Sequence, residues 1–175
     1  MSFLRDLFGG QREMAAEDRT SALAFLVELN ALRAIQDDEA TRYNSALAKW
    51  GGAMIPGGEG LREVASAARK MADVNSDVVR RHAAISPIPD VAGPCFGAWW
   101  QSWQLLDQWS SRAAAGYEGM CEGATPRASG IQQVLAEEGK ARQMAIKEEA
   151  KLLRRLGVTA EEARQLIEAG ERAAR

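Results

Sequence analysis

One stretch of the sequence, residues 95–121, constrains the fold more than any other. It holds four of the five tryptophans of the chain, Trp99, Trp100, Trp103 and Trp109. Its apolar residues recur at alternating steps of three and four, which is the spacing of one face of an α-helix. Its polar residues collect on the remaining arc: Gln101, Gln104, Asp107, Gln108, Ser111 and Arg112. We therefore expect a central helix that contacts several neighbours.

The same spacing recurs in three further stretches, and the chain is therefore expected to be all-α. Clusters of glycine and proline separate the stretches and predict the turns. The expected helices span about 17–50, 60–85, 94–121 and 130–156. No stretch shows the alternation that is typical of a β-strand. Amphipathic helices joined by short breaks predict an antiparallel up-down four-helix bundle over residues 14–156.

Two shorter elements flank the predicted bundle. Residues 1–10 form a short amphipathic N-terminal helix whose apolar side consists of Phe3, Leu4, Leu7 and Phe8. Residues 159–173 form a short C-terminal helix, which Thr159 and Glu162 are expected to cap. The N-terminal segment carries only one arginine, so docking on protein is favoured over peripheral contact with a membrane through residues 3–8.

Polar residues interrupt the apolar faces of the first two predicted helices. Gln36 and Glu39 lie on the face of the first helix, and Asn75 and His82 lie on that of the second. If the two helices pack antiparallel across their turn, Gln36 lies opposite Asn75, and the two amides share one layer of the core. We interpret this internal polar layer as a device that sets the register, with a ligand or proton role as the alternative.

Three residues of the predicted bundle that lie outside this layer join the four apolar residues of the N-terminal segment as candidates for binding a partner. Antiparallel packing at the last turn places Trp109 beside Arg142, where a guanidinium can stack on an indole. Trp100 lies on the polar arc between Asp107 and Ser111, where packing within a monomer does not require a large aromatic residue. Exposed tryptophan is a favoured interface anchor. The alternative for Trp100 is burial under a loop or under the last helix. The candidate partner-binding residues are Trp100, Trp109, Arg142, Phe3, Leu4, Leu7 and Phe8.

The sequence shows no set of residues for catalysis or for a cofactor, and we expect a protein that is not an enzyme. The single histidine, His82, has Val79 three positions before it, so the Glu-x-x-His pairs of a di-iron bundle are missing and no metal is expected. A net charge of −2, together with acidic residues interleaved around Lys147 and Lys151, argues against nucleic-acid binding.

The cysteines indicate a reducing compartment. Cys95 and Cys121 lie in one predicted helix, roughly 39 Å apart at the rise of an α-helix, and cannot form a disulfide within the chain. Both fall on the apolar arc. The sequence contains no recognisable signal peptide and no apolar run of transmembrane length. We therefore expect a cytoplasmic protein.

Trp50-Gly51-Gly52 lies in the predicted turn between the first two helices. It resembles the Trp-x-Gly turn of the small secreted helical-hairpin proteins of type VII systems. The resemblance covers only the first hairpin and implies a helical hairpin there. The Tyr-x-x-x-Asp/Glu export signal that follows the second helix in that family is missing, and the chain is not assigned to it.

These features predict a non-catalytic helical interaction module, that is, a subunit, adaptor or scaffold that binds a protein partner or further copies of itself. One alternative is a small-ligand-binding helical bundle, in which Trp99, Trp103 and Tyr43 line an internal pocket. The other is a membrane-surface-associated assembly protein that uses the segment Phe3–Phe8.

Overall fold

The computed structural model describes residues 16–51, 54–125 and 131–175, and every regular element within these ranges is a helix. The helices are α2 (Ala16–Trp50), α3 (Glu59–Ala84), the short 3-10 helix η1 (Asp90–Ala92), α4 (Gly93–Cys121), α5 (Ile131–Arg155) and α6 (Ala160–Ala174). No β-strand occurs in these ranges. The expectation of an all-α protein whose helices pack against one another is therefore confirmed.

The α-helices begin and end within about one residue of the ranges expected from the apolar spacing. Thr159 caps α6 as expected, since its hydroxyl accepts the backbone N–H of Glu162 and the Glu162 carboxylate accepts the backbone N–H of Thr159. The predicted N-terminal segment, residues 1–10, lies outside the described residues. Within the described part of the chain, no helix is both long and apolar enough to span a membrane.

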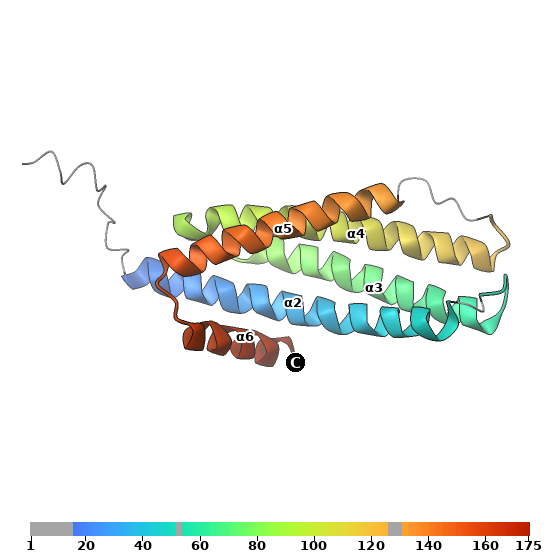
Figure 1. Ribbon diagram of the computed structural model, residues 1–175, viewed down its shortest axis with the longest axis horizontal. Helices are drawn as coiled ribbons and strands as arrows, with labels where there is room; N and C mark the ends of the chain where they lie inside the picture. The colour runs from blue at the N-terminus through green and yellow to red at the C-terminus, as the bar shows by residue number, and fades with distance from the viewer. Residues whose placement is uncertain (1–15, 52–53, 126–130) are drawn as a thin grey trace, which may run out of the picture.

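The helices α2, α3, α4 and α5 extend along the long axis of the molecule, and the shorter α6 lies beside α2 (Figure 1). The helix α3 packs against both α2 and α4, α5 packs against α4, and α6 returns to α2. α6 runs parallel to α2, because Glu162 near its start pairs with Arg19 at 3.1 Å and Gly170 near its end lies against Asn30.

The turn between α2 and α3 is closed by the indole of Trp50. Its Nε1 donates a hydrogen bond of 2.7 Å to Glu63 of α3, and Lys49 Nζ lies 4.8 Å from the ring centroid. Gly60 lies beneath the ring, where an added Cβ would come within 2.6 Å of Cε3 of Trp50. The close approach of Trp50 to Gly60 fixes the pairing of the two helices at this end.

The core consists of two apolar clusters that follow one another along the axis. The first contains large residues of α2, α4 and α5, together with Val78 of α3 and Leu156, which directly follows α5; its members include Phe25, Leu26, Leu29, Trp99, Trp103, Leu106 and Leu152. The second is rich in alanine and comprises Tyr43, Ala46, Val64, Ala68, Met71, Ala72 and Ala114. Of the described helices, only α2, α3 and α4 contribute buried residues to the second cluster, so α5 covers one half of the core.

Polar contacts fasten α5 to its neighbours. Glu149 accepts hydrogen bonds from Nε1 of Trp99 and from Nη1 of Arg33, both at 3.1 Å. The Arg33 guanidinium carbon also lies 5.2 Å from the centroid of the Trp99 ring. Farther toward the start of α5, the buried carboxylate of Glu138 accepts a hydrogen bond of 3.2 Å from Ser102. One glutamate thus joins α5 to both α2 and α4, and the other joins it to α4.

Gly170 is expected to be essential for the contact between α6 and α2. A Cβ at this position would lie 2.5 Å from Cβ of Asn30 and 2.8 Å from the backbone nitrogen of Ala31. We expect Gly170→Ala to destabilise this contact by about 1–3 kcal/mol, because a backbone cannot give way as a flexible side chain can. Faster amide hydrogen exchange confined to α6 would report the loss.

The matched control for this prediction is Gly139→Ala in α5. A Cβ at Gly139 meets no atom within 4 Å, and alanine forms helix better than glycine, so this variant is expected to be neutral or stabilising. Equal protection of the α6 amides in the two variants would contradict the close approach at Gly170.

Candidate functional site

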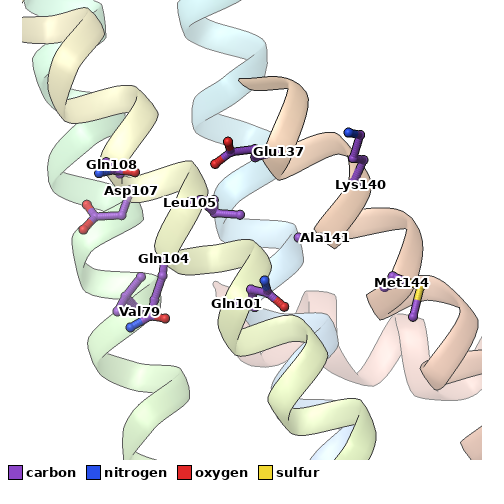
Figure 2. A pocket seen from close by; sticks show the side chains of 10 residues that line it. All are labelled: Val79, Gln101, Gln104, Leu105, Asp107, Gln108, Glu137, Lys140, Ala141 and Met144. Carbon is purple, nitrogen blue, oxygen red and sulfur yellow. The ribbon is translucent and has the colours of Figure 1, made fainter. Parts of the chain in front are cut away.

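A groove of about 760 Å³ runs along the outer face of α4, with α3 on one side and α5 on the other (Figure 2). It is lined by Val79, Gln101, Gln104, Leu105, Asp107, Gln108, Glu137, Lys140, Ala141 and Met144. We call this surface the glutamine groove.

Three glutamines of α4 form the floor of the groove. Gln101, Gln104 and Gln108 follow the three-four spacing and therefore share one face of the helix. The opposite face is occupied by the buried rings of Trp99 and Trp103, so all three amides are turned to solvent. Each amide can donate and accept hydrogen bonds, which makes the floor able to pair with either kind of polar group.

Apolar side chains lie on both sides of these amides. Val79 of α3 and Leu105 of α4 are half-buried at the groove. Met144 of α5 is 51% exposed on the opposite wall, although methionine is a flexible apolar residue that favours contact with other apolar groups. The groove is therefore amphipathic.

Within the part of the chain that the structure describes, three charged groups of the groove have no oppositely charged partner. Asp107 accepts a hydrogen bond of 2.5 Å from the hydroxyl of Ser76, and Glu137 accepts one of 2.9 Å from the amide of Gln133. Both donors are neutral. Among the described residues, neither carboxylate lies within 4.0 Å of a cationic group, and Lys140 is likewise in no ion pair. The groove thus offers two negative charges and one positive charge.

The structure places Trp100 differently from the solvent-exposed anchor that the polar arc predicts. Its indole is half-buried and stacks over the imidazole of His82, with ring centroids 5.9 Å apart and an interplanar angle of 23°. The aromatic neighbour of Trp100 therefore lies within the chain, on α3. Its location on the polar arc of α4 reflects the width of the α3–α4 contact.

The expected contact between Trp109 and Arg142 does not form. Trp109 packs edge-on against Tyr43 of α2, with centroids 6.2 Å apart. Arg142 donates a hydrogen bond of 2.9 Å to Glu138, which also bonds Ser102. α5 is therefore displaced along α4 relative to the register that a tight turn predicts. The physical reason is that the carboxylate of Glu138 is buried and must lie where donors are available.

The candidate internal polar layer separates the two apolar clusters. Gln36, Glu39, Asn75 and Ser110 are buried at the boundary between them. Glu39 lies 3.1 Å from Arg42 and 3.9 Å from Lys70, so its carboxylate is paired. Asn75 differs, since neither its amide nitrogen nor its oxygen has a hydrogen-bond partner in the described part of the chain. The shared amide layer of Gln36 and Asn75 is therefore not a hydrogen-bonded pair.

His82, the fourth member of the predicted layer, lies apart from the others. It is two helical turns beyond Asn75 on α3 and borders the first apolar cluster. The predicted partner-binding residues Phe3, Leu4, Leu7 and Phe8 lie outside the described residues. The structure thus brings together three of the four polar residues, and of the predicted partner-binding residues it describes Trp100, Trp109 and Arg142.

The described residues offer little reactive chemistry. They contain no group of three or more His, Cys, Asp and Glu side chains that could hold a metal ion. Both cysteines are free, and burial raises the pKa of the Cys95 thiol to about 12, so that it stays protonated at neutral pH. Burial raises the pKa of Tyr43 as well.

Sequence reasoning missed the groove, although part of the signal was present. The polar arc of α4, with its regularly spaced glutamines, marks the floor. The walls could not be recognised, because they depend on where α5 lies along α4.

Comparison with protein-family models, with curated proteins and with solved structures gave no match. The groove is therefore interpreted from its own chemistry.

Asn75→Leu is expected to raise the free energy of unfolding by about 1–2 kcal/mol. The reason is that an unpartnered buried amide is replaced by an apolar side chain of similar shape. Urea denaturation measures the change. Asn75→Ala is the matched control and should destabilise, because it removes the polar group but leaves a cavity. A loss of stability with leucine would contradict an unpartnered amide and indicate that water or a ligand binds it.

Proposed function

We propose that the chain is a non-catalytic interaction module that binds an α-helix of a protein partner in the glutamine groove. The observation that carries this proposal is the composition of the groove. It combines exposed apolar side chains, three adaptable amides and three unpaired charges on one concave surface. Concave surfaces of this kind are the usual place where a helix docks.

The dimensions of the groove fit a short helix. The floor extends from Gln101 to Gln108 and the α5 wall from Glu137 to Met144, each about two turns or roughly 10 Å long. A docked helix would place an apolar stripe over Leu105 and toward Met144. Its flanking polar residues would then reach the amides of the floor.

The charges define the partner more closely. Asp107 and Glu137 are both negative, so the partner helix should carry lysine or arginine toward them. Lys140 lies one turn from Glu137 on α5 and would face an acidic residue of the partner. The proposed partner is thus an amphipathic helix with a basic residue on each flank and one acidic residue.

The architecture that we propose for this module is an up-down-up-down core of α2 to α5, with α6 as a fifth helix on α2. The hydrogen bonds that join α5 to α2 and α4 support this arrangement. We also propose that the module works in the cytoplasm, since Cys95 and Cys121 are both free thiols.

A photo-crosslinking amino acid placed in the groove tests the proposal. Met144 and Ile146 are ideal positions, because both lie on α5, both are 51% exposed and only Met144 lines the groove. We expect a protein of the native host to cross-link from position 144 and not from position 146. Cross-linking to a second copy of the chain would identify a homo-oligomer. Equal cross-linking from both positions would contradict the proposal.

Charge substitutions then test the binding mode with the identified partner. Met144→Glu and Glu137→Lys should each weaken binding at least about tenfold, because one introduces a charge into the apolar wall and the other reverses the sign of an unpaired charge. Ile146→Glu is the control and should leave the affinity unchanged. Only the effect of Glu137→Lys should diminish at high salt.

A second candidate function is the binding of a small ligand inside the core. It is favoured by three buried side chains with unpartnered polar atoms, namely Asn75, His82 and Trp103. Such atoms are normally satisfied by water or a ligand. Native mass spectrometry of the gently purified protein should then show a bound small molecule, which Asn75→Leu would displace. An unliganded mass together with stabilisation by Asn75→Leu would contradict this function.

A further inference from the structure

His82 is completely buried, with 0% of its surface exposed. Its imidazole lies between two rings of α4, stacked on Phe96 at a centroid distance of 4.3 Å and on Trp100 at 5.9 Å. Neither ring nitrogen has a hydrogen-bond partner among residues 16–51, 54–125 and 131–175. A histidine is thus used here as an aromatic core residue, although it carries a proton-binding site.

The surroundings of His82 offer nothing that would stabilise a positive charge. The first half of α4, residues 93–106, contains no charged side chain. The charged groups around this corner include Glu28 of α2 and Arg81 of α3, which line an open cleft with Ile85, and the exposed Asp90 of η1. Asp77 on α3 is already paired with Arg80. Burial therefore lowers the pKa of His82 from 6.5 to about 4.

The connection from α3 to α4, residues 85–92, begins three residues after His82. It is held by the apolar side chains of Ile85, Ile88 and Val91, which pack against the first core cluster. The backbone N–H of Ile85 also donates to the carbonyl of His82, at 3.2 Å. The connection can therefore move away without breaking the alanine-rich second cluster at the other end of the molecule.

We propose that His82 is an acid-sensitive lock, whose protonation releases the imidazole from between Phe96 and Trp100 and opens the corner between α3 and α4. The proton binds to whichever ring nitrogen is free once the ring reaches water. The helices beyond the corner stay packed, because the polar layer and the second cluster contain no histidine.

The sign of the pH effect follows from the two protonation equilibria. The opened corner exposes His82, whose pKa is then near its ordinary value of 6.5, whereas the closed corner keeps it near 4. Between these values the opened state binds a proton that the closed state does not. Each unit by which the pH falls through this window favours opening about tenfold. Above pH 6.5 the lock is closed and independent of pH.

The accessibility of Cys95 provides the readout, because this thiol is buried in the first turn of α4 beside Phe96. The full chain would carry Cys121→Ser, so that Cys95 is the only thiol. Its rate of labelling with a dithiodipyridine reagent is normalised to that of a free thiol at each pH. We expect the normalised rate to rise about 40-fold between pH 6.5 and 4.5, with the helical circular dichroism unchanged.

His82→Phe is the matched variant, since phenylalanine can stack between Phe96 and Trp100 but cannot bind a proton. Its normalised labelling rate should not change with pH. Three results would overturn the proposal. The labelling rate of Cys95 in the protein with His82 does not change with pH, it rises equally in His82→Phe, or it rises only together with a loss of helix. Should this variant not fold, the imidazole Cε1–H resonance of the single histidine decides. Protonation of His82 without a rise in labelling would overturn the lock.

Discussion

The indole of Trp99 belongs to a group of three side chains whose polar contacts join three helices. Its N–H bonds Glu149 of α5, and its face carries the guanidinium of Arg33 from α2. Arg33 completes the triangle by bonding the same glutamate. A partly buried carboxylate without such partners would strongly destabilise the fold. Because α5 has glutamates on its inner face, its place along α4 is set by donors such as Trp99 and Ser102.

The need to place α5 where donors are available explains why α5 covers only one half of the core. The donors for α5 lie in the first half of α4, where Trp99 and Trp103 also supply large apolar surfaces. α5 is therefore drawn toward the first cluster. The other half of the core relies on alanine, for example Ala68 and Ala114, which lets three helices approach closely without a fourth. The polar layer at Asn75 marks the border between these two modes of packing.

The sequence predicted what depends on local spacing and missed what depends on distant partners. The bounds of the helices follow from a repeat of 3.6 residues, which any amphipathic helix must obey. The positions of α5 and α6 do not, since the first depends on finding donors for Glu138 and the second on a close approach at Gly170. The stacking of Trp100 on His82 is likewise a contact between two helices, which local spacing does not reveal. The same holds for the groove. Its glutamine floor follows from spacing within α4, whereas its α5 wall depends on where α5 lies along α4.

The glutamine groove and the proposed lock share structural elements, and a coupling between them follows. Val79 of the groove wall is about one turn from His82 on α3, and Gln101 of the floor directly follows Trp100 on α4. Opening the corner would shift this end of the groove, while the bond between Ser76 and Asp107 holds its other end. A helix that binds only the closed groove must therefore stabilise the closed corner to the same extent as closure strengthens its binding. Binding of the partner helix would thus oppose the opening of the α3–α4 corner that protonation of His82 favours.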